Sequence, residues 1–177
     1  MKIILQDASY LKCIIPKCGK EYVISSTRIH CDCGNLLDVK YKNTPSTKLK
    51  ETFYQRHNPQ GSIFNESGVW RFRELLNFCQ IDTENLEECS KNLVSLDGAE
   101  GRQSKPYHMS KVAEFIGIDS EKLMLQPEGY NPSGSFKDNG MSAAVTHAKM
   151  VNAKKIICAS TGNTSASAGM FAANENI

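Results

Sequence analysis

The chain has 177 residues, of which 40% are hydrophobic and 23% are charged, and its formal net charge is +2. These values are typical of a soluble globular protein, and the charged residues form no clustered basic stripe of the kind that binds nucleic acid. No segment approaches the roughly 18 apolar residues of a membrane span, and the first residues are too short an apolar run for a secretory signal. We therefore expect a cytoplasmic protein with no nucleic-acid and no membrane partner.

Four of the seven cysteines lie close together near the start, as the pairs Cys13/Cys18 and Cys31/Cys33. An odd number with this clustering is not the pattern of a disulfide framework, and it favours a reducing compartment and a metal site. Four thiolates are the ligands of a closed tetrahedral zinc site. The spacings are irregular for a zinc knuckle, so two alternatives stay open. Either His30 replaces one cysteine as a ligand, or the segment is a β-ribbon with free thiols.

Composition divides the chain into three stretches. Short β-like runs at 21–24 and 36–41 accompany the clustered cysteines and predict a small Cys-rich, zinc-ribbon-like module over residues 1–42. Residues 43–68 are polar and rich in Asn, Pro, Ser, Thr and Gly, which indicates a linker or surface segment. Residues 69–177 have an α/β pattern.

Helices and short strands alternate through this third stretch. We expect helices at 70–78, at 110–116 with Ser110 as the N-cap, at 136–151 and at 163–174, and strands at 93–96, 122–126 and 156–159. The alternation is typical of a parallel sheet with crossover helices. Residues Met141, Ala144, Val145 and Ala148 have helical spacing and predict an apolar face. The strands are too few for a complete doubly wound sheet, so we expect an incomplete α/β domain, either a fragment or a truncated product.

A loop at 131–138, with the sequence Asn-Pro-Ser-Gly-Ser-Phe-Lys-Asp, follows the strand expected at 122–126. Ser135 and Asp138 have the spacing of a capping box that begins the next helix. Lys137 then lies at the C-terminal end of a strand, where open α/β sheets bind ligands. The positive end of the helix dipole favours a neutral amine over an ammonium, and Schiff-base chemistry needs a neutral amine. The alternative is a solvated surface lysine.

A second loop at 160–165, with the sequence Ser-Thr-Gly-Asn-Thr-Ser, again lies between an expected strand and an expected helix. Its hydroxyls and backbone N–H groups are suited to holding an anion such as a carboxylate. Taken alone, it could equally be an ordinary Ser/Thr-rich helix cap. Taken together, the two loops supply an amine and an anion cradle, which a pyridoxal-phosphate (PLP) enzyme acting on an amino acid requires.

Two stretches of sequence carry a family resemblance. PEGYNPSGSFKDNGM at 127–141 and ICASTGNTSASAGMFAA at 157–173 resemble the fold-type-II PLP enzymes, and within them the threonine synthases. The Cys-rich start and GVWRFRELL at 68–76 extend the resemblance upstream. Two departures from the family pattern concern the substrate: Asn139 stands where Arg is commoner, and the segment at 100–107 lacks the family's Thr-Pro-Leu run.

The resemblance implies that Lys137 holds PLP, that Asn163 hydrogen-bonds the cofactor's ring oxygen, and that Ser160, Thr161 and Thr164 bind the substrate carboxylate. It implies a lyase of threonine biosynthesis that converts O-phospho-L-homoserine and water to L-threonine and phosphate. The family's loop for the PLP phosphate is not found in these residues, so we expect this chain alone to be inactive. The alternatives are a threonine or serine dehydratase and a non-catalytic binding module. A homo-oligomer is left open.

Overall fold

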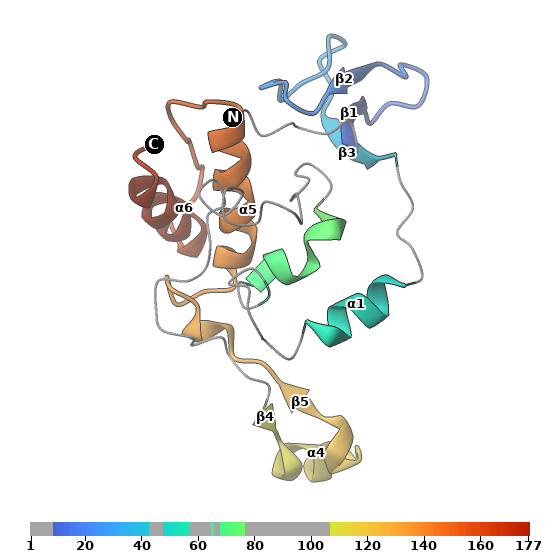
Figure 1. The fold of residues 1–177 in the computed structure, drawn as a ribbon, viewed down its shortest axis with the longest axis vertical. Helices are drawn as coiled ribbons and strands as arrows, with labels where there is room; N and C mark the ends of the chain where they lie inside the picture. Colours follow the sequence, from blue (N-terminus) through green and yellow to red (C-terminus); the bar gives the residue numbers. More distant parts are fainter. Residues whose placement is uncertain (1–8, 43–47, 57–64, 66–67, 77–106) are drawn as a thin grey trace.

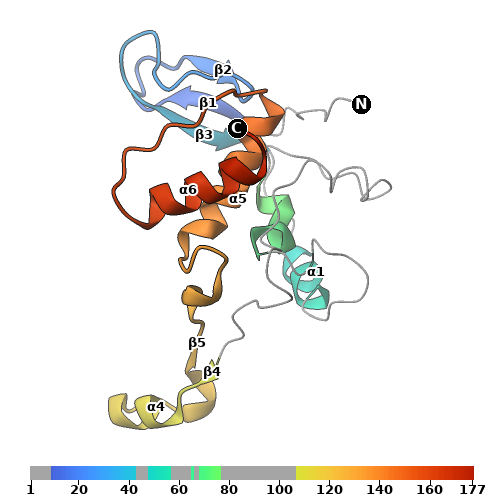
Figure 2. The same cartoon turned by 90° about the vertical axis from the view of Figure 1, so that its left-hand side faces the viewer.

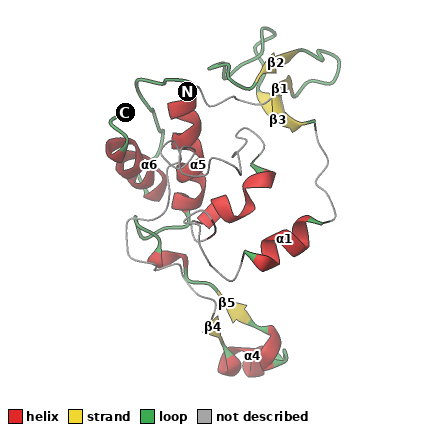
Figure 3. Cartoon of the chain, viewed as in Figure 1, coloured by secondary structure: helices red, strands yellow, loops and turns green. Residues whose placement is uncertain are grey.

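The computed structural model describes residues 9–42, 48–56, 65, 68–76 and 107–177, and it is a mixed α/β structure (Figures 1 and 3). The elements with described bounds are β1 (Ser9–Cys13), β2 (Glu21–Val23), β3 (Leu37–Tyr41), α1 (Leu49–Gln55), η1 (Gly68–Leu75), β4 (Tyr107–His108), α4 (Ser110–Ile116), η2 (Ser120–Lys122), β5 (Met124–Leu125), η3 (Glu128–Tyr130), α5 (Lys137–Met150) and α6 (Asn163–Asn174). None of the helices in the described ranges has the length and apolarity that crossing a bilayer requires.

The first sheet is antiparallel, with strand order β2–β1–β3. Its register places Leu11 opposite Tyr22 on one side and opposite Val39 on the other. Alternate residues of β1 are buried, as the two-residue period of a strand requires. The strands expected at 21–24 and 36–41 are confirmed as β2 and β3, each one residue shorter than expected.

Helices α1 and η1 are held together by Arg56, which forms an ion pair with Glu74. Trp70 of η1 is fully buried. The helix expected at 70–78 is found as the 3-10 helix η1, which has a kink at Phe72 (φ −107°, ψ 28°), and residues 77–78 lie outside the described ranges. Helix α1 lies within the stretch that composition indicates as a linker or surface segment.

Helices α5 and α6 pack side by side and run in the same direction (Figures 1 and 2). Near their N-terminal ends, the Ser167 hydroxyl donates to the Asp138 carboxylate at 2.6 Å. Near their C-terminal ends, Lys149 forms an ion pair with Glu175. Because the two contacts occur in the same order along both helices, α5 and α6 run in the same general sense, as consecutive crossover helices of an α/β unit do. The helices expected at 136–151 and 163–174 are thus confirmed.

The core between these helices is centred on Val145 and Phe171, against which Met141 and Ile156 pack. The apolar face expected for α5 is wrong in part, because Ala144 is exposed. The other buried residues of α5 are polar: Asp138, Ser142 and Thr146. Their spacing of four residues places them on one face of the helix, from which Asp138 contacts Ser167 of α6.

A parallel sheet is not found among the described residues, whose strands all pair antiparallel. The strand expected at 122–126 is reduced to β5, which pairs with β4. Residues 156–159 form no strand, and Ile157 is 93% exposed. A parallel strand needs a partner that a crossover brings alongside, and the described part of the chain places none beside 156–159. The strand expected at 93–96 lies outside the described residues.

Elements α4, β4 and β5 lie together at the end of the molecule away from the first sheet (Figures 1 and 2). The helix expected at 110–116 is confirmed, but its expected cap is wrong. Ser110 is the first helical residue, and the cap position belongs to Met109, which makes no side-chain capping bond.

Candidate active site and cysteine cluster

Lys137 is the first residue of α5 and is half-buried. Its Nζ lies 4.5 Å from the centre of the Phe136 ring. Within the described ranges, Nζ has no hydrogen bond and no ion pair, so neither kind of interaction has to break before the amine can react. The preceding turn depends on Gly134, whose φ of +76° is in the left-handed region that favours glycine.

The Lys137 loop is fixed by hydrogen bonds to two carboxylates. Glu128 accepts from the amides of Asn131 at 2.7 Å, Asn139 at 3.0 Å and Gln126 at 3.1 Å. These bonds tie the residues before the loop to the first turn of α5. The sequence indicated Asn139 as a departure from the family, and the structure gives it a partner in Glu128.

The second carboxylate is that of Asp138, and it does not form the expected capping box. The Ser135 hydroxyl accepts from the Lys137 N–H at 3.2 Å, but Asp138 does not bond the backbone N–H of Ser135. Instead it accepts from the Ser133 N–H at 2.7 Å, from the Ser133 hydroxyl and from the Ser167 hydroxyl at 2.6 Å. The carboxylate therefore links the Lys137 loop to α6, a contact that local sequence spacing does not reveal.

The loop before α6 holds the remaining predicted residues. The Ser160 hydroxyl accepts from the Gly162 N–H at 3.2 Å, and the Ser165 hydroxyl donates to the Gly162 carbonyl at 2.8 Å. In the described part of the chain, the Thr161 and Thr164 hydroxyls make no hydrogen bond. Asn163 begins α6 and is exposed. The loop thus presents an amide and two hydroxyls that are available to a ligand.

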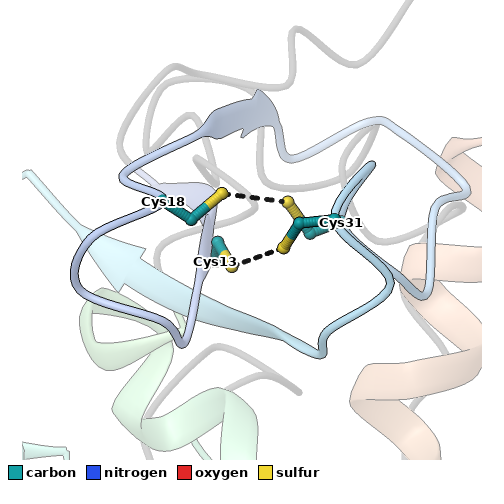
Figure 4. A group of neighbouring side chains, drawn as sticks. Cys13, Cys18 and Cys31 are labelled. Atoms are coloured by element: carbon teal, nitrogen blue, oxygen red, sulfur yellow. Dashed lines mark hydrogen bonds between the residues drawn. The ribbon is translucent and has the colours of Figure 1, made fainter.

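The four clustered cysteines come together, as Figure 4 shows for the three that it labels. The sulfur atoms of Cys13, Cys18, Cys31 and Cys33 all lie within 4.8 Å of one another. Two pairs, Cys13/Cys33 and Cys18/Cys31, are each 3.6 Å apart. A tetrahedral zinc site with Zn–S bonds of about 2.3 Å has sulfur atoms about 3.8 Å apart, so the cluster has the size of such a site. His30 is not a member of this group among the described residues.

The irregular cysteine spacing is accommodated by two glycine turns. Gly19 and Gly34 follow the second cysteine of each pair and have φ values of +64° and +83°. These φ values allow the backbone to turn directly after each pair. In addition, the Ile15 N–H donates to the Cys13 Sγ at 3.4 Å. Hydrogen bonds from the side chain and backbone of Asn35 lower the pKa of the Cys33 thiol to about 6. A metal ligand must be deprotonated, so these bonds favour the ligating form of Cys33.

Comparison with known proteins finds a family model that matches the part of the chain containing this site. Residues 103–177 match the family model described as pyridoxal-phosphate dependent enzyme. This range contains Lys137, the loop before α6 and both carboxylates. The predicted resemblance to PLP enzymes is therefore confirmed, and PLP is the cofactor that the family implies.

Several threonine synthases are similar to the chain. That of Methanocaldococcus jannaschii is 36% identical over 163 residues, which are 92% of this chain and 34% of the relative. That of Methanosarcina acetivorans is 34% identical over 169 residues, 95% of this chain and 35% of the relative. A Bacillus threonine synthase (strain ULM1) is 65% identical over 62 residues, 35% of this chain and 17% of the relative. The chain spans about a third of the length of the two archaeal relatives, and the predicted resemblance to threonine synthase is confirmed.

Proposed function

We propose that the chain is part of a threonine synthase, a PLP-dependent lyase that converts O-phospho-L-homoserine and water to L-threonine and phosphate. One observation carries the proposal. Lys137 and Asn163 each begin one of two parallel helices, and the hydrogen bond from Ser167 to Asp138 holds the starts of these helices together. An amine and a ligand-binding loop at adjacent helix starts fit the needs of a PLP site. The similarity to threonine synthases supports the choice of substrate.

The roles of the residues follow from their positions. Bound PLP supplies an electron sink for negative charge on the substrate carbons. Lys137 would hold the cofactor through its amine, and as a free amine it would move protons at the α and β carbons of the substrate. This role needs a neutral amine, which the positive end of the α5 dipole favours. Asn163 would help to hold the cofactor through its side-chain amide.

The substrate carboxylate is bound by the loop before α6. Thr161 and Thr164 have hydroxyls without partners in the described residues, and Ser160 stands at the start of the same loop. The positive end of the α6 dipole adds a favourable field for an anion. In this arrangement the carboxylate lies at one helix start and the reacting amine at the other.

The wider organisation is proposed as well. Residues 1–42 form a zinc-ribbon-like module, 43–68 a connecting segment and 69–177 part of the PLP-binding domain. We propose that the segments at 122–126 and 156–159 belong to a parallel sheet at the bases of α5 and α6. We place the protein in the cytoplasm, in line with its composition, and we propose an amino acid as its substrate. A homo-oligomer is left open.

The decisive experiment for the cofactor site is chemical labelling of the full-length protein. Borohydride reduction in the presence of PLP, followed by peptide mapping, should place the label on Lys137. The Lys137→Ala variant should take up no label, and Lys122→Ala, which changes an exposed lysine, should be labelled normally. A label on another lysine would overturn the assignment. Release of phosphate from O-phospho-L-homoserine, compared with formation of a 2-oxo acid from L-threonine, separates a synthase from a dehydratase.

We also propose that Cys13, Cys18, Cys31 and Cys33 hold one structural zinc ion, on the basis of their mutual distances. Protein purified without chelator should contain one zinc per chain. The Cys18→Ser and Cys31→Ser variants should lose it, whereas Cys158→Ser, which changes a cysteine outside the group, should retain it. Sub-stoichiometric zinc that these substitutions leave unchanged would favour the β-ribbon with free thiols.

A further inference from the structure

A carboxylate without a counter-ion is buried directly beside Lys137. The Asp138 side chain is 0% exposed, and no ion pair in the described ranges includes it. Burial of an uncompensated charge is costly, so such a group persists only where hydrogen bonds replace water. Asp138 has three donors, and as the second residue of α5 it also lies at the positive end of the helix dipole.

The donors come from two different parts of the fold. The backbone N–H and hydroxyl of Ser133 belong to the loop that leads into Lys137. The hydroxyl of Ser167, also 0% exposed, belongs to α6 and donates at 2.6 Å across a separation of 29 residues. One carboxylate therefore closes the Lys137 loop on itself and fastens it to the neighbouring helix.

The position of Ser167 on α6 relates its contact with Asp138 to Asn163. Ser167 lies four residues after Asn163, so the two residues share one face of the helix and are about one turn apart. Because Ser167 faces Asp138, Asn163 lies on the side of α6 that faces the start of α5. The Asp138–Ser167 hydrogen bond therefore lies near both loops and constrains the distance between Lys137 and Asn163.

We propose that Asp138 is a positioning residue: with Ser133 and Ser167 it forms a clamp that sets the Lys137 amine against the Asn163 loop, and so fixes the geometry in which both meet one cofactor. The inference rests on the proposed function. The sequence pattern predicted only a helix-capping role for Asp138, and the clamp gives it a second role. Functional sites tolerate displacements of only about half an ångström. A small shift of Lys137 relative to the Asn163 loop would therefore weaken cofactor binding, even though Asp138 acts through its neighbours.

The test uses the full-length protein and three substitutions that weaken the clamp to different degrees. Asp138→Asn replaces one acceptor oxygen by a donor amide, Ser167→Ala removes the bond to α6, and Ser133→Ala removes one hydroxyl but keeps the backbone donor. The matched control is Ser142→Ala. Ser142 is equally buried on the same face of α5, but its hydroxyl donates to the Asn139 carbonyl of its own helix at 3.1 Å.

Four readouts separate positioning from general stability. They are the PLP dissociation constant, the pH dependence of the visible absorption of the lysine-bound cofactor, the midpoint of chemical unfolding, and the hydrogen-exchange rate of the Ser133 amide. Asp138→Asn and Ser167→Ala should each raise the dissociation constant roughly tenfold, which corresponds to about 1.4 kcal/mol. Both should shift the pH profile and speed exchange at Ser133. Ser142→Ala should lower the unfolding midpoint but leave the other three readouts within a factor of two.

The outcomes are distinct. An Asp138→Asn or Ser167→Ala protein with wild-type PLP affinity and pH profile would overturn the proposal. A Ser142→Ala protein that matches these two variants in every readout would overturn it as well. If Asp138→Asn does not fold, Ser167→Ala decides by the same criteria. If the unsubstituted protein carries no PLP on Lys137, the proposed function fails. The Ser133 exchange rate, measured without cofactor, then still decides whether Asp138 fixes the loop.

Discussion

Glu128 illustrates how single polar residues shape the candidate site. It receives three amide donors from residues on both sides of the Lys137 loop, and both of its oxygens are used. A carboxylate offers only acceptors, so it suits a place where three N–H groups converge. A glutamine at this position would place its NH₂ group against one of these N–H donors.

We therefore expect Glu128→Gln to destabilise the fold by about 1–2 kcal/mol, the usual cost of leaving hydrogen-bonding groups unmatched. Equilibrium denaturation of the full-length protein measures the change. Glu121→Gln is the matched control, because Glu121 is exposed and its side chain has no hydrogen bond in the described ranges. Equal losses in the two variants would show that the Glu128 network contributes nothing specific.

His147 connects the Cys-rich sheet to α5, since its Nε2 lies 3.2 Å from the Ile24 carbonyl oxygen. Burial lowers the pKa of His147 below its usual value of 6.5. The unfolded chain therefore takes up this proton before the folded chain does as the pH falls. The neutral ring stabilises the fold fully above pH 6.5, and this contribution is lost as the pH drops through the lower, folded-state pKa.

The expected result is a fall in stability on acidification from pH 7 that is shallower in a His147→Gln variant. Glutamine keeps a donor for the Ile24 carbonyl but does not titrate. Unfolding midpoints measured from pH 7 to about pH 5 give the two slopes, in a window set by the histidine pKa. His108→Gln, which changes an exposed histidine, should follow the wild type. Identical slopes for wild type and His147→Gln would contradict the expected role of burial.

At the scale of elements, the packing of α5 against α6 forms the core next to the two loops. Phe171 is 4% exposed and packs with Val145 between α5 and α6, whereas Phe115 of α4 is 90% exposed. Phe171→Ala should cost about 3 kcal/mol because it leaves a cavity, and Phe115→Ala less than about 0.5 kcal/mol. Chemical denaturation of both variants checks the difference. Similar losses would mean that the contact between α5 and α6 is not the core of this part of the chain.

The bounds of these two helices were predicted almost to the residue, although neither has a side-chain cap at its start. Helix α6 has the predicted bounds, and α5 is one residue shorter at each end. The buried face of α5 was not predictable, since Asp138, Ser142 and Thr146 are polar residues that a hydrophobic pattern assigns to solvent. The strand expected at 156–159 also failed, because apolar character alone does not make a strand without a neighbouring strand to pair with.

In the candidate site, the residues of short sequence motifs were predictable, whereas a contact between distant residues was not. Lys137, Asn163 and the four cysteines follow from short sequence patterns, and the structure brings the cysteines together as expected. The bond from Ser167 to Asp138 joins residues 29 positions apart. Sequence spacing gave Asp138 a local role in capping, and no periodicity in a single sequence connects it to Ser167. Only the parallel packing of α5 and α6 reveals the contact.

At the scale of the whole molecule, much apolar surface is left uncovered. Phe115, Ile116 and Ile118 around α4, Met124 and Leu125 of β5, and Ile157 are all exposed. Exposed apolar residues in such number on neighbouring elements are unusual for an independent monomer and mark surfaces that other protein segments cover. The chain spans about a third of its archaeal relatives, so their folds have further segments with which to cover such surfaces.

We accordingly expect the 177 residues, expressed alone, to release no measurable phosphate from O-phospho-L-homoserine even with added PLP. The proposed cofactor lysine and the proposed carboxylate-binding loop are present, but the resemblance assigns the cup for the PLP phosphate to other residues. Attachment through Lys137 alone leaves the ring free to reorient, and catalysis requires it to be held to within about half an ångström. The uncovered apolar surface should also bind a hydrophobic dye strongly and favour self-association. Phosphate release, dye fluorescence and sedimentation, each compared with the full-length protein, measure these properties. Turnover equal to that of the full-length enzyme would show that the phosphate cup lies within these residues and that the proposed division of the site is wrong.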